Sequence, residues 1–331
     1  MPPATLDVLA IGNAIVDVLA RVDEAFLTDW QLAKGSMRLI DEAEAERLYG
    51  AFGPAIEVSG GSAANTVAGV ASLGGAAGFL GKVRDDQLGA VFAHDIRAAG
   101  VRYTMPGSRD GPATGRSLIA VTPDGERTMN TFLGASALIG PADIVEEEVA
   151  AASILYLEGY LFDRPEAKQA FEKAAAIARA AGRRVALTLS DSFCVARHRA
   201  DFLQLIDSGV DVLFANEAEA QTLFQRDTLD GLIAEARRHC PLVSLTRSAL
   251  GSVIIAGEET HAVPAMRVEE VVDVTGAGDL YAAGFLFGLC RGMSLLANAR
   301  LGTFAAAEII THFGARPLEP LRQQAQARGF L

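Results

Sequence analysis

Nine residues near the C-terminal end of the chain read Val272-Asp273-Val274-Thr275-Gly276-Ala277-Gly278-Asp279-Leu280, and an apolar run to Leu289 follows them. A glycine-rich turn that opens a helix leaves backbone N–H groups without intrahelical partners, at the positive end of the helix dipole. Such a turn predicts a binding site for an anion such as a phosphate. An aspartate beside it can accept a proton from a hydroxyl while the amides hold a phosphoryl group. The candidate catalytic groups are therefore Asp279 and the amides of Gly276, Ala277 and Gly278.

A second glycine cluster lies near the other end of the chain and reads Ser59-Gly60-Gly61-Ser62-Ala63-Ala64-Asn65. The double glycine lets a ligand approach the backbone closely. We expect Ser62 to cap the following helix, which would leave the amide of Asn65 in the first turn free to bond a ligand hydroxyl. An ordinary glycine turn with a serine cap explains the same residues, and the sequence alone leaves this alternative open.

The composition excludes several classes of function. The chain has 331 residues, half of them apolar, and a net charge of −12. The length and the apolar content allow a sizeable core, whereas the acidic balance argues against nucleic acid or an anionic membrane as a partner. Three widely separated cysteines, Cys194, Cys240 and Cys290, predict neither a disulfide framework nor a zinc site. With neither a signal peptide nor an apolar run of transmembrane length in the sequence, we expect a cytoplasmic protein.

Apolar strand patterns alternate with helical patterns through much of the chain, which predicts a doubly wound, mostly parallel α/β sheet flanked by helices. Expected strands are 6–11, 154–157, 185–189, 212–214, 242–245 and 252–255, and expected helices are 62–73, 165–181, 200–206 and 217–224. Two inserts, at about 13–40 and 102–132, contain short alternating segments typical of β-hairpins. We expect these inserts to form a small β lid on a single domain that spans residues 1–331.

Other phosphate-binding motifs do not fit the chain. Gly81-Lys82 approaches a P-loop, but position 76 is alanine and Val83 follows the lysine, so the hydroxyl that would bind magnesium is missing. Gly12-Asn13-Ala14 follows the first strand where a dinucleotide-binding fold would carry GxGxxG. Protein-kinase signatures are absent as well.

The two glycine clusters resemble, in their order and separation, the two signatures of the PfkB, or ribokinase-like, family of carbohydrate kinases. The resemblance covers nearly the whole chain and implies a ribokinase-like fold and an ATP-dependent phosphotransferase. Asn216-Glu217-Ala218-Glu219 resembles the NxxE element of that family, which implies that Asn216 and Glu219 bind Mg²⁺ through its waters beside the triphosphate. The same residues also read as a helix N-cap and a capping box, and both interpretations can hold together.

The resemblance assigns further nucleotide contacts. The stretch from Thr246 to Gly251 is similar to the family's strand-end loop that contacts ATP, which makes Thr246, Arg247 and Gly251 candidate ATP contacts, with a solvated surface arginine as the alternative for Arg247. Thr303 stands where related sugar kinases often carry Asn and adenosine kinases His. The segment 124–128 resembles a lid element whose arginine, here Arg127, reaches the transferring phosphate.

The N-terminal segment resembles the adenosine kinase branch of the family, whose GNxxxD opening matches the residues from Gly12 to Asp17. A carboxylate suits a vicinal diol because it can accept from both hydroxyls. The resemblance implies that Asp17 holds the ribose hydroxyls, with Asn13, Gly61 and Asn65 beside it. Met37 stands where adenosine kinases tend to carry glutamine. Two further residues could line an apolar pocket for the base, with core packing as the alternative for both: Phe132 and Leu161.

We therefore expect an enzyme that transfers the γ-phosphate of ATP to the 5′-hydroxyl of a purine nucleoside, with Mg²⁺ as cofactor. Two alternatives stay open: a kinase for a free sugar, such as ribose or a ketohexose, and a catalytically silent protein that binds a nucleoside or a sugar. The sequence predicts a small-molecule partner and no nucleic-acid or membrane partner. It leaves open whether the chain is a monomer or a homodimer and whether it requires a monovalent cation.

Overall fold

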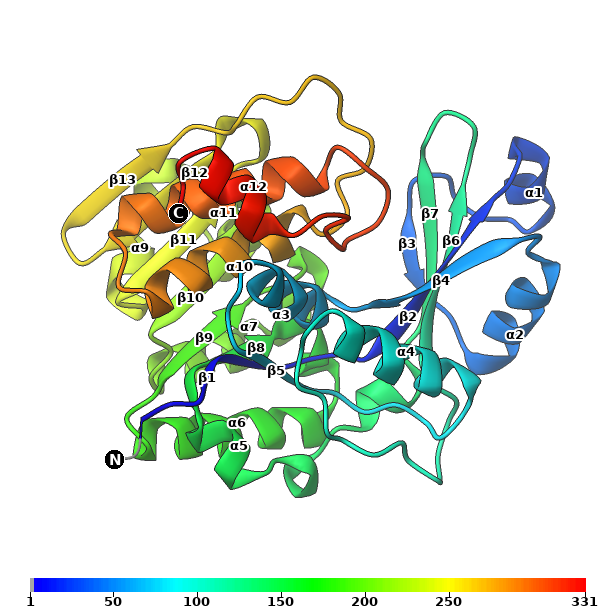
Figure 1. The fold of residues 1–331 in the computed structure, drawn as a ribbon, viewed down its shortest axis with the longest axis horizontal. Coiled ribbons are helices and arrows are strands. Elements are labelled where there is room, and N and C mark those ends of the chain that lie inside the picture. Colours follow the sequence, from blue (N-terminus) through cyan, green and yellow to red (C-terminus); the bar gives the residue numbers. More distant parts are fainter. Residues whose placement is uncertain (1–2) are drawn as a thin grey trace.

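Two β-sheets organise the chain, and the computed structural model describes residues 3–331 of it (Figure 1). Six neighbouring strands of the eight-stranded core sheet run parallel from one edge, and the two pairings at the other edge are antiparallel. This confirms the expected doubly wound α/β fold. The core strands, in spatial order, are β13 (Glu259–Val263), β12 (Ser252–Ala256), β11 (Leu242–Thr246), β10 (Val212–Asn216), β9 (Arg184–Thr188), β8 (Ala152–Glu158), β1 (Leu6–Ile11) and β5 (Ala77–Leu80).

Both faces of the core sheet are covered by helices, because successive side chains of each strand enter opposite apolar clusters. Tyr156 of β8, for example, enters one cluster, while its neighbours Leu155 and Leu157 enter the other. One cluster includes α3 (Ser62–Ser72), α4 (Gln87–Ala98), α10 (Ala277–Cys290), α11 (Leu295–Ile309) and α12 (Leu321–Ala327). The other includes α5 (Glu146–Ala150), α6 (Pro165–Ala180), α7 (Ser192–Asp207), α8 (Glu217–Phe224) and α9 (Leu229–His239). Strands that are apolar on both faces are what such burial requires.

Helix α7 begins earlier than the expected helix at 200–206. The side chain of Asp191 caps it by accepting a hydrogen bond from the amide of Cys194 at 2.9 Å. The backbone leaves helical geometry at His198, where φ is −123° and ψ is 25°. This interruption divides the helix, and the apolar periodicity of the sequence identified only the part after it.

The second sheet, called the small sheet below, has five strands. Its order is β3 (Met37–Leu39), β7 (Arg127–Phe132), β6 (Gly115–Val121), β2 (Ile15–Arg21) and β4 (Ala55–Gly60). Strands β6 and β7 form an antiparallel hairpin, as the composition of the second insert suggested. The first insert is no hairpin: β2 pairs in parallel with β6, and β3 pairs in parallel with β7.

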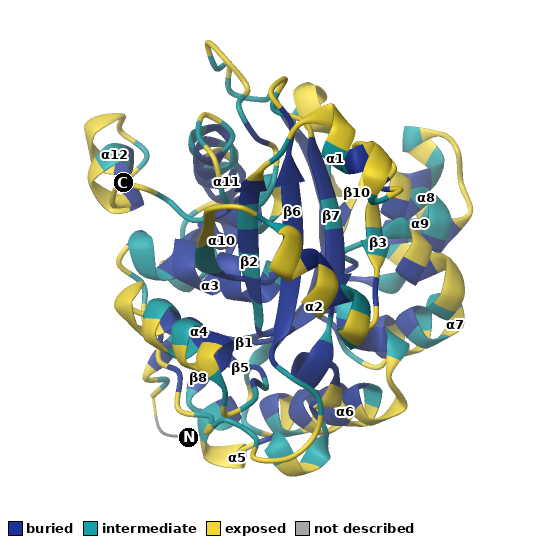
Figure 2. Ribbon diagram, turned by 90° about the vertical axis from the view of Figure 1, so that its right-hand side faces the viewer, coloured by how far each residue is buried: buried dark blue, intermediate teal, exposed yellow. Residues whose placement is uncertain are grey.

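The small sheet is also larger than the two inserts. Strand β4, which lies outside both of them, pairs antiparallel with β2, and the helices α1 (Glu24–Asp29) and α2 (Glu42–Ala51) complete this part of the fold. Side chains of β2 alternate, with Val16 and Val18 buried against the apolar cluster and Asp17 on the opposite face. Figure 2 shows the buried strands of this sheet behind the partly exposed helices α1 and α2.

Among residues 3–331, no helix combines the length and the apolar character that crossing a membrane requires. All three cysteines are free.

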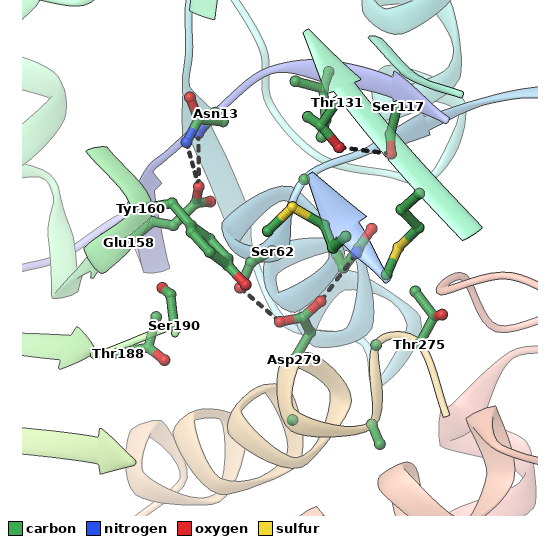
Figure 3. A pocket seen from close by; sticks show the side chains of 18 of the residues that line it. Asn13, Ser62, Ser117, Thr131, Glu158, Tyr160, Thr188, Ser190, Thr275 and Asp279 are labelled. Atoms are coloured by element: carbon green, nitrogen blue, oxygen red, sulfur yellow. Dashed lines mark hydrogen bonds between the residues drawn. The ribbon is translucent and has the colours of Figure 1, made fainter. Parts of the chain in front are cut away.

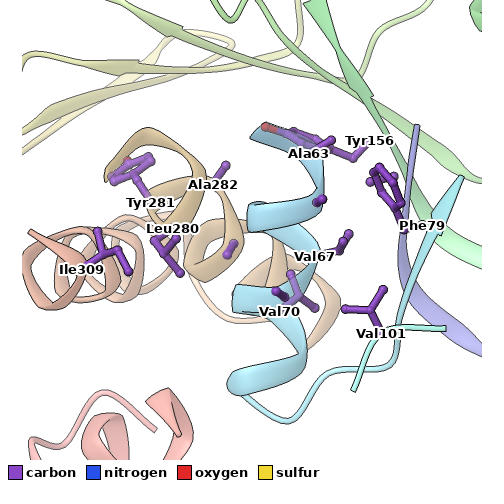
Figure 4. Close-up of a cluster of buried hydrophobic side chains, with 14 of the residues drawn as sticks. Ala63, Val67, Val70, Phe79, Val101, Tyr156, Leu280, Tyr281, Ala282 and Ile309 are labelled. Atoms are coloured by element: carbon purple, nitrogen blue, oxygen red, sulfur yellow. The ribbon is translucent and has the colours of Figure 1, made fainter. Parts of the chain in front are cut away.

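The helices α3, α10 and α11 pack closely beside the core sheet (Figure 4). Glycines make this approach possible: a Cβ added at Gly284 of α10 would lie 2.7 Å from the backbone nitrogen of Gly302 in α11. A Cβ added at Gly69 of α3 would lie 2.6 Å from Cβ of Ala283 in α10. Because α10 carries the 272–280 motif at its N-terminus, these contacts fix the position of that motif relative to α3.

Replacing Gly284 with alanine should therefore destabilise the protein, since its new methyl group meets backbone atoms that cannot rotate away. We expect Gly284→Ala to lower the free energy of unfolding by about 1–3 kcal/mol, measured by urea denaturation. Gly50→Ala is the matched control, because Gly50 lies in helix α2 and an added Cβ there has no neighbour within 4 Å. The control should raise stability by up to about 1 kcal/mol. Equal midpoints for Gly284→Ala and the wild type would show that α10 and α11 are not in tight contact.

Candidate active site

A cavity of about 450 Å³ lies between the two sheets, at the carboxyl ends of core strands β8 to β11 (Figure 3). Ligand sites of open α/β sheets are found at this edge. The small sheet supplies the opposite wall through strands β2, β3, β6 and β7. The expected site residues that line the cavity are Asn13, Asp17, Met37, Gly61, Asn65, Asn216, Glu219, Thr246, Gly276, Ala277, Gly278 and Asp279.

Asp279 joins the two glycine clusters. It lies in the first turn of α10, and its carboxylate accepts hydrogen bonds from the hydroxyl of Ser62 at 2.6 Å and from the side-chain amide of Asn65 at 3.0 Å. Ser62 therefore does not cap α3 with its side chain; Gly61, with φ of 99°, occupies the N-cap position. Burial raises the pKa of Asp279, against the opposing effect of these two hydrogen bonds and of Arg316. A carboxylate held in this way is oriented to accept a proton.

The turn before α10 presents backbone amides to the cavity. Gly276 adopts the left-handed conformation with φ of 79°, which favours glycine. The amide of Ala277 donates to the carbonyl of Val274 at 3.2 Å, so it is engaged within the turn. The amides of Gly276 and Gly278 have no acceptor within residues 3–331. The anion site expected from the sequence thus rests on these two glycines, with Ala277 stabilising the turn.

Asp17 projects into the cavity from β2 and lies directly over the double glycine. A Cβ added at Gly60 would fall 2.5 Å from the carboxyl group of Asp17, so any side chain at position 60 would displace it. Burial raises the pKa of Asp17 to about 7, against the opposing charges of Arg316 and Arg127. This carboxylate is placed to accept hydrogen bonds from a ligand in the cavity.

A pair of hydroxyls continues the polar row on the small sheet. Ser117 lies opposite Asp17 in the β2–β6 ladder, and Thr131 lies opposite Ser117 in the β6–β7 ladder. The two hydroxyls are hydrogen-bonded to each other at 2.9 Å and line the cavity. They share one hydrogen bond, so one O–H donor and several lone pairs stay available to a ligand. Neither residue was predicted from the sequence, although the alternating pattern of 116–121 contained Ser117.

Asn13 holds a further carboxylate, Glu158, which is buried and was not predicted from the sequence. Glu158 accepts from the backbone amide of Asn13 at 3.2 Å, from its side-chain amide at 2.7 Å, and from the backbone amide of Ala63 at 2.8 Å. Burial raises the pKa of Glu158 to about 7. The side-chain oxygen of Asn13 accepts from Ser136 at 2.9 Å, so Asn13 is fixed on both sides. The sequence did contain a signal for this residue, because Glu158 directly follows the apolar strand 154–157.

Arg127 does not line the cavity but connects the small sheet to the loop before α10. Its guanidinium lies 2.5 Å from the carboxylate of Asp273 and donates to the hydroxyl of Thr275 at 3.3 Å. It also lies over the ring of Phe313, 5.4 Å from the centroid. The Asp273 carboxylate accepts from the amides of Thr275 and Gly314 as well, so these hydrogen bonds hold Asp273 in place.

Asn216 and Glu219 form the capping box of α8 that was one of the two interpretations of NxxE. The side chain of Asn216 accepts from the Glu219 amide at 2.9 Å, and the Glu219 carboxylate accepts from the backbone and side-chain amides of Asn216 at 2.9 and 2.7 Å. Burial raises the pKa of Glu219 to about 7, and no ion pair neutralises it within residues 3–331. A buried carboxylate facing a cavity fits a hydrated divalent cation. Among residues 3–331, no three His, Cys, Asp or Glu side chains are placed to bind a metal ion directly.

Three expected nucleotide contacts lie outside the cavity lining. Arg247 is paired with Glu217, with nitrogen–oxygen distances of 3.3 Å. Gly251 has φ of 87°, and an added Cβ would lie 2.0 Å from the carbonyl oxygen of Val263, so the tight turn before β12 explains this glycine. Thr303 is half-buried in α11. Thr246 does line the cavity and donates to the carbonyl of Ala215 at 3.4 Å.

Two residues expected in the base pocket are core residues instead. Phe132 is 9% exposed and Leu161 is 2% exposed, and each belongs to an apolar cluster. Side chains of a strand alternate between faces, so Thr131 of β7 points into the cavity while its neighbour Phe132 points away. Tyr160, the neighbour of Leu161, lines the cavity. The alternative of core packing was therefore correct for both residues.

Arg316 is a further residue that the sequence analysis missed. It follows α11 in an irregular segment, and its guanidinium donates to the carbonyl of Ser59 at 3.2 Å, the hydroxyl of Ser59 at 3.0 Å and the carbonyl of Ala64 at 3.0 Å. Nothing in the local sequence connects this arginine with a glycine cluster more than 250 residues earlier, because only the packing of the chain brings the two together.

Comparison with known proteins agrees with this geometry. Residues 56–322 match the model of the pfkB family of carbohydrate kinases. The solved structure of an adenosine kinase from Sinorhizobium meliloti is 52% identical and superposes with a TM-score of 0.92, covering 98% of this chain and 100% of that one. A probable sugar kinase from Rhizobium etli CFN 42 is 49% identical with a TM-score of 0.93, covering 99% and 100%. Adenosine kinase of Saccharomyces cerevisiae is 26% identical over 332 residues, covering 94% of this chain and 96% of that protein. The chain belongs to the pfkB family of carbohydrate kinases and is an ATP-dependent nucleoside or carbohydrate kinase.

Proposed function

We propose that this kinase transfers the γ-phosphoryl group of ATP to the 5′-hydroxyl of a purine nucleoside. The observation that carries the proposal is the carboxylate of Asp279, which Ser62 and Asn65 orient in a cavity whose opposite wall bears Asp17. Asp279 is the general base, and Asp17 holds the vicinal diol of the ribose. The 52% identical protein from Sinorhizobium meliloti, an adenosine kinase, supports the choice of acceptor.

The chemistry follows from the positions of these groups. Asp279 takes the proton of the acceptor hydroxyl as the oxygen attacks the γ-phosphorus, and the bond to the β,γ-bridging oxygen breaks. Amides of Gly276 and Gly278 stabilise the negative charge on the transferring group. Mg²⁺, when bound, neutralises charge on the phosphates, and Asn216 and Glu219 would hold it through its waters. Thr246 lies on the same side of the cavity and is the ATP contact that the lining supports.

The wall beyond Asp17 favours a nucleoside over a free sugar. The side chains do not fill the space next to this wall. Five apolar side chains line it: Ile15, Leu39, Ile119, Met129 and Leu133. A sugar presents hydroxyls on every side and would leave such a surface unfilled, whereas a purine is a flat, largely apolar body. The Ser117–Thr131 hydroxyls can pair with the polar edge of the base. Met37, which is 44% exposed at the mouth, can cover the base but cannot form an amide's hydrogen bonds.

A sugar kinase is the second candidate. The polar row of Asp17, Ser117 and Thr131 is hydroxyl-rich and would suit a polyol, and the 49% identical protein from Rhizobium etli is a probable sugar kinase. The two candidates differ in what fills the space next to the apolar wall, and binding measurements distinguish them.

The small sheet acts as the lid in this proposal, on one kinase domain that spans the chain. Arg127, which pairs with Asp273 in this structure, would turn toward the phosphates when ATP is present, since phosphate oxygens can accept two parallel hydrogen bonds from a guanidinium. Closure over the acceptor would exclude water from the reacting phosphate.

Asp279→Asn should lower kcat by about 10²–10⁴, because asparagine keeps the shape of the side chain but cannot take a proton. Acceptor binding, measured by calorimetry, should change little. Asp230→Asn is the control, since Asp230 occupies the first turn of α9, outside the cavity lining. A kcat for Asp279→Asn within a few-fold of the wild-type value would rule out Asp279 as the base.

Asp17→Ala should weaken binding of the acceptor far more than binding of ATP. Loss of the charge-assisted hydrogen bonds to a diol corresponds to about 2–3 kcal/mol, or roughly a 30-fold or larger increase in the acceptor Kd. Asp23→Ala is the control from the segment that follows β2, because Asp23 caps α1 and does not line the cavity. Titrations in which both substrates weaken equally in Asp17→Ala would contradict the diol assignment.

A panel of acceptors tests the nucleoside proposal directly. Adenosine should raise the melting temperature more than ribose or fructose at equal concentration, because the base buries additional apolar surface. ATP consumption should follow the same order, and Asp279→Asn provides the blank that separates turnover from silent binding. Stabilisation by ribose or fructose with no effect of nucleosides would refute the nucleoside acceptor and favour the sugar kinase.

A further inference from the structure

Arg316 holds the glycine cluster from both of its ends. Two of its hydrogen bonds reach Ser59, the residue before the double glycine, and the third reaches the carbonyl of Ala64, in the first turn of α3. Ser59 is held from the other side as well, because its amide donates to Asp95 of α4 at 2.8 Å. The arginine thus ties the end of a small-sheet strand, β4, to a core helix.

The segment between these two anchor points touches both candidate functional carboxylates. Gly60 lies against the carboxyl group of Asp17, and an added Cβ at Gly61 would fall 2.1 Å from the carbonyl oxygen of Asn13, so the backbone here has no room to shift. Ser62 and Asn65 supply both hydrogen bonds to Asp279. A displacement of residues 59–64 would therefore move the groups that position Asp17 and Asp279 together.

We propose that Arg316 is a positioning residue of the phosphotransfer site, which fixes residues 59–64 between β4 and α3 and supplies the permanent positive charge opposite Asp17 and Asp279. It contacts no reacting atom in this role and acts through the segment that it holds. The inference rests on the proposed role of Asp279 as the base, but not on the identity of the acceptor.

The charges around the cavity show why a fixed cation matters. The ionisable groups that act on Asp279 or respond to it come from several elements, and all but one are acidic or phenolic: Asp17, Tyr156, Glu158, Tyr160, Glu219 and Arg316. Arg127 acts on Asp17, but it is paired with Asp273 and is carried by the small sheet. Arg316 belongs to the core and lowers the pKa of both Asp17 and Asp279 against the effect of burial.

The test compares a substitution that removes the charge of Arg316 with one that keeps the charge but loses the hydrogen-bond geometry. Arg316→Gln removes the cation, so the pKa of Asp279 should rise, and the acid limb of the kcat/KM profile should move to higher pH by roughly one unit. Arg316→Lys keeps the charge but cannot make the three-point contact with Ser59 and Ala64. It should leave the acid limb near its wild-type position while kcat falls by about tenfold, the effect of roughly a 1.4 kcal/mol loss of positioning.

The control is Arg322→Gln, which removes a guanidinium from the same C-terminal region, where Arg322 lies against Gly74 away from the cavity. It should change neither the acid limb nor kcat. Melting curves establish that each variant is folded. If Arg316→Gln does not fold, the kcat of Arg316→Lys carries the test of positioning.

A folded Arg316→Gln variant with the acid limb of the wild type, or an Arg316→Lys variant with the wild-type kcat, would overturn the proposal. Failure of the base assignment gives a different result, because Asp279→Asn would then retain activity. The assay uses whichever acceptor the panel identifies, so a sugar acceptor leaves the test intact.

Discussion

The hydrogen bonds from Ser62 and Asn65 to Asp279 are the interaction on which the rest of the site depends. They join residues 217 and 214 positions apart and bring the two glycine clusters face to face. Each cluster alone is an ordinary turn before a helix. Together they place a buried carboxylate next to unpaired amides, with a cavity between them, and this arrangement suits phosphoryl transfer.

The packing of the core helices holds the two glycine clusters against each other. Helices α3 and α10 can bring their first turns together only because their axes approach closely, and Gly69 leaves space for this approach, while Gly284 leaves space for α11 against α10. Helix α10 is buried from Leu280 to Gly288, so apolar packing on all its sides prevents it from sliding. Close packing of small residues therefore sets the distance between Ser62 and Asp279, and the position of the Asp279 carboxylate depends on the packing of the core.

The sequence predicted the parts of the site that local patterns encode. Glycine turns, an aspartate in a first turn and the Asn216–Glu219 capping box each have a local physical signature, and the structure places them as expected. The base-pocket prediction for Phe132 and Leu161 was wrong because moving one residue along a strand or a turn reverses the face to which the side chain points. Glu158 and Arg316 were missed because their partners lie far along the chain. Strand β4 was missed from the small sheet for the same reason, since its pairing with β2 is not a local property.

The acidic groups of the cavity also make the stability of the fold depend on pH. The folded protein raises the pKa of Asp17 from 3.8 to about 7 and that of Glu158 from 4.5 to about 7. A raised pKa means that the folded state binds protons more tightly than the unfolded state. The stabilisation from these groups is complete below their unfolded values and is lost as the pH rises through about 7. In the proposed mechanism Asp279 and Asp17 act as ionised carboxylates, and for Asp17 this is the pH range in which it stabilises the fold least. Arg316 and Arg127 reduce this conflict because each favours the ionised form of Asp17.

The two arginines differ in how they are held. Arg316 is hydrogen-bonded to the backbone of the glycine cluster, whereas Arg127 is carried by the small sheet and paired with Asp273. Under the proposed mechanism Arg316 therefore keeps its position throughout, whereas Arg127 would change partner when phosphates bind.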